Sequence, residues 1–118
     1  MNIGKGAFKH CQNICSIAIP HSVTNISKEA FLSCPNLNSI TVDMNNTSYT
    51  DISGNLFTKD KKTLIQYAAG KTDSHYSIPD GVVTIDEYAF YHEDNLVSIF
   101  MTDSVTSINR NAFLYCFS

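Results

Sequence analysis

The sequence has little charge, no tryptophan and no concentration of basic residues. Asp, Glu, Lys and Arg together make up only 16% of its 118 residues, and the formal net charge is −3. Three lysines, Lys59, Lys61 and Lys62, stand close together, but no larger basic cluster is present. Proteins that bind nucleic acid normally present a dense basic surface, so nucleic acid is not an expected partner.

Long apolar runs are also absent. No segment approaches the roughly 20 consecutive apolar residues that a membrane-spanning helix needs, so membrane insertion is not expected. The first residues, Met1-Asn2-Ile3, lead directly into a repeated motif and do not form a signal peptide. We therefore interpret the sequence as a mature chain or as a piece of a longer one.

What the sequence does contain is a six-residue motif in which an Ile is followed by three variable residues and then by Ala-Phe. Its four copies are Ile3–Phe8, Ile26–Phe31, Ile85–Phe90 and Ile108–Phe113. The spacing between the first two isoleucines recurs between the last two. A fixed period of this size indicates a repeat protein in which each unit packs on the next.

A strand pattern lies between the copies of the motif. Ile17 and Ile19 alternate with smaller or polar residues, and the alternation recurs at Ile40 and Val42. Period two predicts short strands with one inward face. We expect an α/β repeat solenoid with a right-handed coil, a concave parallel sheet of about four short strands, and 3₁₀ or short helical turns on the convex side. The residues expected to be buried are Ile17, Ile19, Ile40, Val42, Ile78, Ile99 and the four Ala-Phe pairs.

One enlarged repeat interrupts the period, because the spacing from Ile26 to Ile85 is more than twice that between the other neighbouring copies. Within it, Gly54–Thr58 and Thr63–Tyr67 are rich in β-forming residues and flank a lysine-rich turn. This pattern predicts a β-hairpin, in an enlarged coil at about 43–73. We expect the hairpin to replace the convex half of that coil, and two extra strands in the concave sheet are the alternative.

Three of the four cysteines, Cys11, Cys34 and Cys116, occupy one column of the repeat, where a small buried side chain suits the packing. Glu93 takes this position in the third copy, so the column does not require a thiol. We interpret these residues as buried thiols in preference to disulfide partners. Cys15 lies in a column that is not part of the core, and we expect a partly exposed thiol there.

The spaced pattern Ile-x-x-x-Ala-Phe-x-x-Cys-x-x-Leu-x-x-Ile-x-Ile-Pro-x-Ser-Val-Thr-x-Ile resembles the BspA-like leucine-rich repeats of bacterial and protist surface proteins. The resemblance covers essentially the whole chain, although the last strand has Met101-Thr102 in place of Ile-Pro. It implies one leucine-rich-repeat domain over residues 1–118, with about four coils, that belongs to a longer array. It also implies a non-enzymatic module for protein–protein interaction or adhesion, at the cell surface or secreted.

The candidate site is a surface formed by outward positions of the strands. Small and hydroxyl side chains predominate there, which suits a broad protein partner better than a small molecule. Phe100 is the exception; it is either an interface anchor or a surface side chain covered by the neighbouring coil. The residues predicted to bind a partner are Ser16, Ala18, Thr41, Asp43, Ser77, Ser98, Phe100 and Thr102.

Other functions stay open at this point. The repeats could be a structural spacer in a larger protein, or an enzyme site in the insert could use Asp51, Asp60 or Asp73 with His75. No histidine stands at metal-binding spacing from a cysteine or another histidine, so neither a metal nor a cofactor is expected. By the resemblance, the partner is a host, matrix or cell-surface protein, with a glycan as the alternative.

Neither end of the sequence carries a polar cap. Ile3 and Phe8 have no preceding strand to pack against, and Ile99 and Met101 have no following one. An uncapped repeat exposes residues that are interior elsewhere in the array. We therefore expect either continuation into further repeats or self-association through the ends.

Overall fold

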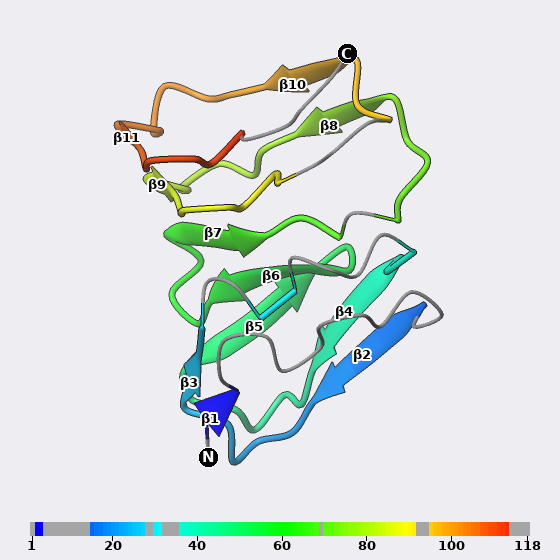
Figure 1. The fold of residues 1–118 in the computed structure, drawn as a ribbon. Helices are drawn as coiled ribbons and strands as arrows, with labels where there is room; N and C mark the ends of the chain where they lie inside the picture. Colours follow the sequence, from blue (N-terminus) through cyan, green and yellow to red (C-terminus); the bar gives the residue numbers. More distant parts are fainter. Residues whose placement is uncertain are drawn as a thin grey trace.

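Short β-strands connected by turns make up the described part of the chain (Figure 1). The computed structural model describes residues 2–3, 15–27, 30–31, 36–68, 70–91 and 95–113. No helix occurs among these residues. The strands are β1 (Asn2–Ile3), β2 (Ser16–Ile19), β3 (Asn25–Ile26), β4 (Ser39–Val42), β5 (Tyr49–Ile52), β6 (Asn55–Thr58), β7 (Thr63–Gln66), β8 (His75–Ser77), β9 (Thr84–Ile85), β10 (Ser98–Phe100) and β11 (Ser107–Ile108).

The strands that carry the alternating pattern, β2, β4, β8 and β10, are termed the front strands. β2 and β4 pair in parallel with Ile17 opposite Ile40. β8 and β10 pair in parallel with Tyr76 opposite Ile99. Both pairs join residues 23 positions apart, so each sequence repeat packs on the next one along the chain. Parallel pairing is thus confirmed, but a single sheet of about four strands is wrong, because the two pairs form separate sheets.

The strands that carry the motif isoleucine, β1, β3, β9 and β11, are termed the return strands. β1 pairs with β3 and β9 pairs with β11, again in parallel and at the same offset in sequence. A turn closed by one backbone hydrogen bond follows each of the last two, from Ala89 N to the Asp86 carbonyl at 3.2 Å and from Ala112 N to the Asn109 carbonyl at 3.2 Å. The predicted helical turns are therefore not confirmed in the described residues.

The insert is an antiparallel meander of three strands, β5, β6 and β7. The predicted hairpin is present as β6 and β7, but β5 was not predicted. β5 and β6 are joined by Ser53 and Gly54, with φ of 53° and 84°. Two positive φ values in a two-residue loop are typical of a type I′ turn, whose twist suits a hairpin.

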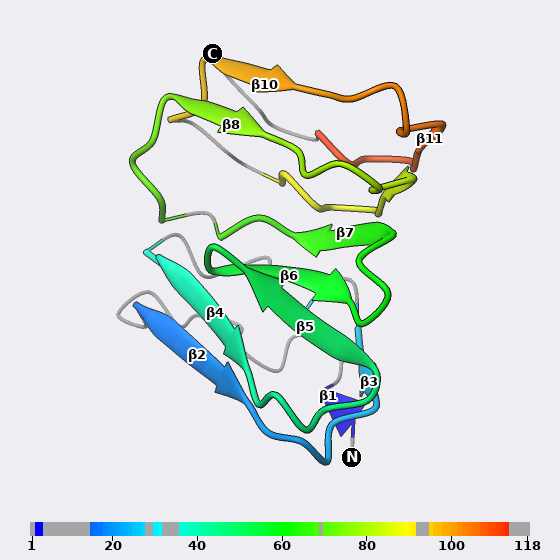
Figure 2. The same cartoon turned by 180° about the vertical axis from the view of Figure 1, so that it is seen from behind.

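The meander joins the return strands and not the front strands. β7 pairs in parallel with β9, with Leu64 opposite Ile85, and the five-stranded sheet has the order β11-β9-β7-β6-β5. Figure 2 shows β5, β6 and β7 between the lower strands β2 and β4 and the upper strands β8 and β10. The alternative of two extra strands in the front sheet is thus wrong, because β6 and β7 pair with the return strands.

The meander also explains why the front sheet is interrupted. On the edge of β4, Ile40 N donates to the Gly54 carbonyl at 2.8 Å, and Val42 N donates to Asp51 Oδ1 at 2.8 Å. On β3, the buried Ile26 N donates to the Tyr49 hydroxyl at 3.0 Å. Backbone N–H groups at a strand edge need acceptors. Here two side chains of β5 and one turn carbonyl replace the strand that would otherwise continue each sheet.

An aromatic column crosses the last three repeats. Tyr67 N donates to the Ala89 carbonyl at 2.8 Å, and Phe90 N donates to the Ala112 carbonyl at 2.8 Å. The rings of Tyr67 and Phe90 have centroids 5.3 Å apart, and those of Phe90 and Phe113 are stacked at 5.1 Å. Tyr67 therefore supplies the aromatic ring of the missing Ala-Phe motif in the enlarged repeat.

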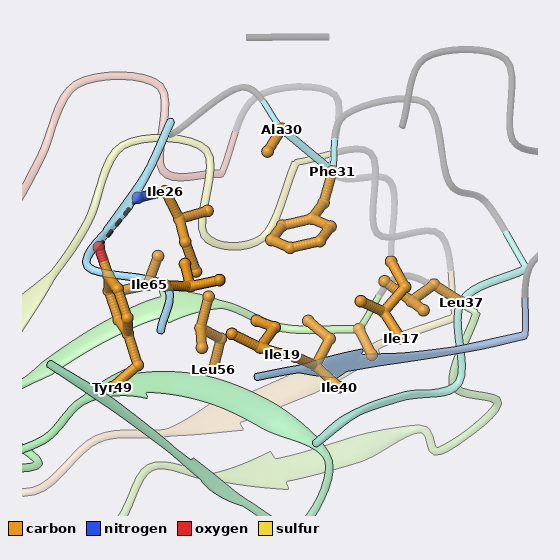
Figure 3. Packing of buried hydrophobic residues seen from close by; sticks show 12 residues of the cluster. Ile17, Ile19, Ile26, Ala30, Phe31, Leu37, Ile40, Tyr49, Leu56 and Ile65 are labelled. Carbon is orange, nitrogen blue, oxygen red and sulfur yellow. Dashed lines mark hydrogen bonds between the residues drawn. The ribbon is translucent and has the colours of Figure 1, made fainter. Parts of the chain in front are cut away.

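The core consists of two hydrophobic clusters that share β6 and β7. Leu56 belongs to the first cluster and its neighbour Phe57 to the second, and Ile65 and Leu64 divide in the same way. Figure 3 shows the first cluster, with Phe31 directed into it from a turn. Because successive residues of a strand point to opposite sides, the meander forms a wall with one cluster on each face.

Most of the predicted core is confirmed. Ile17, Ile19, Ile40, Ile78, Ala30-Phe31, Ala89-Phe90 and Ala112 are buried. Val42, Ile99 and Phe113 are only partly buried, which corrects the prediction for these residues. Ile99 and Phe113 lie in the last described repeat, on which no further described repeat packs, and Val42 lies where the front sheet stops. Ala7 and Phe8 lie outside the described residues.

Among the cysteines, only Cys15 is described. It is a thiol and not part of a disulfide, and it is exposed, as predicted. Cys11, Cys34 and Cys116 lie outside the described residues, so their assignment as buried thiols stays a prediction.

Tyr76 occupies the inward position of β8 and packs against the aromatic column. Its ring centroid is 4.9 Å from that of Tyr67 and 6.1 Å from that of Phe90. The Tyr76 hydroxyl is buried and makes no hydrogen bond, and the same is true of Asn55 Nδ2. Burial raises the pKa of Tyr76 to about 12, and the nearby Asn55 amide offsets only part of this effect.

We expect Tyr76→Phe to stabilise the domain by about 1 kcal/mol near neutral pH, because it removes a buried hydroxyl that has no partner. It should also reduce the alkaline loss of stability. An unfolded tyrosine ionises near pH 10 and folded Tyr76 near pH 12, so the wild type loses stability as the pH rises through this window. Urea unfolding at pH 8 and pH 11 measures both effects. Tyr88→Phe, at a partly exposed tyrosine, is the control, and an equal pH dependence in the two variants would contradict the prediction.

Candidate partner-binding surface

The first half of the candidate surface lies on β2 and β4. Exposed and buried residues alternate along β2, so Ser16 and Ala18 face outward while their neighbours face the core. Thr41 stands opposite Ala18 and is exposed, and Asp43 follows β4 and is exposed too. The structure thus places these four residues on one outward face, termed the polar face (Ser16, Ala18, Thr41 and Asp43).

The second half lies on β8 and β10 and is termed the aromatic face (His75, Ser77, Ser98, Phe100 and Thr102). Ser77 and Phe100 are opposite one another and exposed. Ser98 and Thr102 are only half-exposed, and both are engaged. Ser98 Oγ lies 2.6 Å from His75 Nδ1, and Thr102 Oγ1 lies 2.6 Å from Ser104 Oγ, which donates to the Val82 carbonyl at 2.8 Å.

The two faces do not form one continuous surface. The repeat period predicts rows of four side chains across the front, such as the row through Ala18, Thr41, Ser77 and Phe100. The structure forms the first two as one pair and the last two as another, in separate sheets. In Figures 1 and 2 the meander lies between the sheets, and β2 and β4 are inclined to β8 and β10. A partner that touches both faces must therefore cross the meander.

The polar face is hollowed, but only slightly. A depression of about 390 Å³ opens onto solvent there, lined by Ala18, Ile19, Pro20, Thr41, Val42 and Asp43. Sites that enclose a small molecule bury most of its surface within a concave pocket. An open depression with small side chains suits contact with a protruding part of a larger partner.

The aromatic face consists mainly of small polar side chains, but it carries one large exposed aromatic ring. Phe100 is 59% exposed, so in the described structure it is not covered by a neighbouring repeat. The ring centroids of His75 and Phe100 are 6.5 Å apart. Val97 and Met101, before and after β10, are exposed as well, but by the alternation along the strand they belong with Ile99 and not with Phe100. A large exposed aromatic side chain is typical of an interaction surface.

Charge is distributed unequally along the chain, a feature that the whole-chain net charge conceals. Residues 72–109 contain seven carboxylates and no Lys or Arg, whereas all eight Lys and Arg residues lie in the rest of the chain. A count of charges by segment would have revealed this from the sequence. Both strands of the aromatic face lie within this acidic stretch.

Two exposed carboxylates stand next to each other at the end of the aromatic face. Asp80 follows β8 and Asp103 follows β10. Neighbouring repeats have the same offset at β8 and β10 as at β9 and β11, so these two aspartates occupy equivalent stacked positions. Like charges at equivalent positions of adjacent repeats repel one another. A cation placed between them would relieve the repulsion.

The residues considered for an enzyme site are not brought together. Asp51 accepts a hydrogen bond from Val42 N, and His75 contacts Ser98. Asp60, in the β6–β7 turn, accepts from Lys62 N at 3.0 Å and from Thr58 Oγ1 at 2.7 Å, and these bonds lower its pKa. No hydrogen bond links any of Asp51, Asp60 and Asp73 with His75 in the described part of the chain.

Metal-binding clusters and membrane-spanning helices are both absent from the described ranges. No group of three or more His, Cys, Asp or Glu residues there could hold a metal ion. In the same ranges, no helix is long and apolar enough to cross a membrane.

Comparison with solved structures found bacterial proteins of the same architecture. A leucine-rich repeat protein from Eubacterium ventriosum is 34% identical with a TM-score of 0.89, covering 97% of this chain and 30% of that one. A leucine rich cell surface protein from Faecalibacterium prausnitzii is 36% identical with a TM-score of 0.81, covering 95% and 30%. The pneumococcal vaccine antigen PcpA is 28% identical with a TM-score of 0.78, covering 83% and 24%. The chain thus spans less than a third of each of these proteins.

Comparison of sequences agrees with the stacking seen in the fold. No match was found among the curated proteins. The family described as "BspA type Leucine rich repeat region" matches residues 1–118, in six copies. The structure shows the same repetition, because strands one repeat apart pair in parallel at a constant offset and the motif isoleucines lie opposite one another. The chain belongs to the BspA-type leucine-rich repeat family.

Proposed function

We propose that this chain is a non-enzymatic protein-binding module of a cell-surface or secreted leucine-rich-repeat protein. The partner is a host, matrix or cell-surface protein, and it binds to the outward side of the front strands. The observation that carries the proposal is the aromatic face, where Phe100 is 59% exposed on a sheet whose outward side is otherwise formed by His75 and small hydroxyl residues. Aromatic residues of this kind are common anchors in protein interfaces.

Similarity to surface proteins supports the location. Two of the structures above are described as a cell surface protein and as a vaccine antigen. The open depression of the polar face favours a large partner over a small one. The separate hydrogen bonds of Asp51, Asp60 and His75 favour binding over catalysis, because a catalytic site needs such groups to converge.

The repeats also fit into a larger assembly. We propose that they are part of a right-handed curved solenoid with the front strands on its concave side. The last described repeat exposes Met101 and Ile108 and only partly covers Ile99. Another repeat or a second copy of the chain stacked there would bury these residues.

A binding assay with matched variants tests the proposal. The immobilised domain is offered a panel of purified extracellular matrix and host surface proteins, and an array of glycans. We expect at least one protein to bind, and Phe100→Ala or Thr41→Lys to weaken it by about tenfold or more. Ile108→Ala and Thr106→Lys make similar changes at exposed residues on the return side and should leave binding unchanged.

Each alternative has its own outcome in this assay. Equal binding by both front variants and the wild type would contradict binding through the front strands. Binding to the glycan array alone would favour a carbohydrate partner. An absence of binding to every probe would favour the structural spacer.

A further inference from the structure

The chemistry of the aromatic face indicates which kind of partner it fits. We propose that it binds an extended, basic segment of a protein, with an apolar side chain against Phe100 and a Lys or Arg beside Asp80 and Asp103. This inference rests on the proposed function and deepens it. It places the main contact of the partner on β8 and β10, and it specifies that the bound segment of the partner is positively charged.

The apolar part of the site is the ring of Phe100, which is 59% exposed and stands opposite the exposed Ser77 of β8. Burial of such a side chain by a partner provides a driving force that does not depend on salt.

The charged part of the site lies directly beyond β8 and β10. Asp80 and Asp103 are exposed and stacked in adjacent repeats, within the stretch 72–109 that has no Lys or Arg. The two cations at the borders of this stretch are engaged elsewhere. Lys71 Nζ donates to the Ser53 carbonyl at 2.8 Å, and Arg110 lies 3.9 Å from Glu87. In the described part of the chain Asp80 and Asp103 form no ion pair, although the backbone of Lys62 contacts Val83 and Thr84 close by; the field of the two aspartates favours a cationic partner.

The spacing of these groups sets the form of the partner. Phe100 and Asp103 are three residues apart, and an extended chain rises about 3.3 Å per residue, so their Cα atoms are at most about 10 Å apart. An extended segment with an apolar residue and a Lys or Arg two or three positions further along spans the same distance. The polar face offers no such combination, because none of its four residues is aromatic or large and apolar.

Selection from a random peptide library provides the test. Bead-bound random peptides are selected on the immobilised domain, and the affinities of the selected peptides are measured at low and high salt. We expect enrichment of Lys and Arg together with an aliphatic or aromatic residue, and binding that weakens as salt rises. Phe100→Ala should weaken the selected peptides by about tenfold. The double variant Asp80→Asn/Asp103→Asn should weaken them by about fivefold and reduce the salt dependence.

Controls separate this inference from the proposed function. Glu87→Gln removes one carboxylate of the same acidic stretch in the turn after β9, outside both faces, and should leave peptide binding unchanged. Selected peptides without an excess of basic residues, no selected peptides at all, or binding that survives both aromatic-face variants would overturn the inference. If Thr41→Lys abolishes binding while Phe100→Ala does not, protein binding by the front strands stands and only its assignment to the aromatic face fails.

Discussion

Gly70→Ala is expected to destabilise the domain by about 4 kcal/mol or more, or to prevent folding. Gly70 N donates to the Leu37 carbonyl at 2.7 Å, so two chain segments cross here in direct backbone contact. A Cβ atom on Gly70 would lie 2.3 Å from the carbonyl carbon of Asn36 and 2.6 Å from Leu37 N. These neighbours are backbone atoms and cannot rotate away, so the segments would have to separate and give up their hydrogen bond.

Urea unfolding of Gly70→Ala, with Gly81→Ala as control, measures the effect. Gly81 has a φ of 92°, but a Cβ atom there would meet nothing within 4 Å. Its substitution should cost about 1–2 kcal/mol from backbone strain alone. A Gly70→Ala variant no less stable than Gly81→Ala would show that the crossing is not as tight as the structure indicates.

Asn46→Leu is expected to cost about 3–5 kcal/mol. Asn46 is buried, and its Nδ2 donates to the carbonyls of Pro20 and Val23 at 3.0 and 2.9 Å. Its Oδ1 accepts from Ser48 N and Tyr49 N at 2.7 and 2.9 Å. Leucine has a similar size but no polar atoms, so Ser48 N, Tyr49 N and the Val23 carbonyl would lose their partner, while the Pro20 carbonyl would keep only its 3.3 Å bond from Val23 N. The side chain thus fixes the start of β5 to the loop between β2 and β3.

A graded series of variants checks this prediction by thermal or urea unfolding. Ser104 makes one bond to the Val82 carbonyl in the next pair of repeats, and Ser104→Ala should cost about 1 kcal/mol. Asn45→Ala changes an exposed neighbour and should have an effect of about 0.5 kcal/mol or less. If Asn46→Leu falls within the range of these two, the four hydrogen bonds do not hold the insert in place.

The regular repeats could be predicted because each of their residues has an equivalent one repeat away. Ile17 and Ile40, for example, are alike in the sequence and opposite in the structure. The interruption of the front sheet could not be predicted in this way. It depends on Tyr49 and Asp51, two alternate side chains of β5 that accept hydrogen bonds from Ile26 N and Val42 N. Such side-chain to backbone contacts leave no period in the sequence.

The candidate surface shows the same division. Period two predicted correctly that Ala18, Thr41, Ser77 and Phe100 face outward. It also predicted that they form one row, which is wrong, because a row requires an unbroken sheet. The acidic character of residues 72–109 is present in the sequence. That Asp80 and Asp103 are stacked beyond the strand of Phe100, however, follows only from the register of β8 and β10.

The wall formed by β6 and β7 has a consequence for how the domain responds to force. In a simple repeat array each unit contacts only its neighbours, so units can detach one after another from an end. Here Leu56 and Phe57, adjacent on one strand, are held by different hydrophobic clusters. Pulling the first cluster apart therefore removes support from the second, and the reverse is equally true. Under tension, the repeats on both sides of the meander should rupture together in a single event and not peel away one by one.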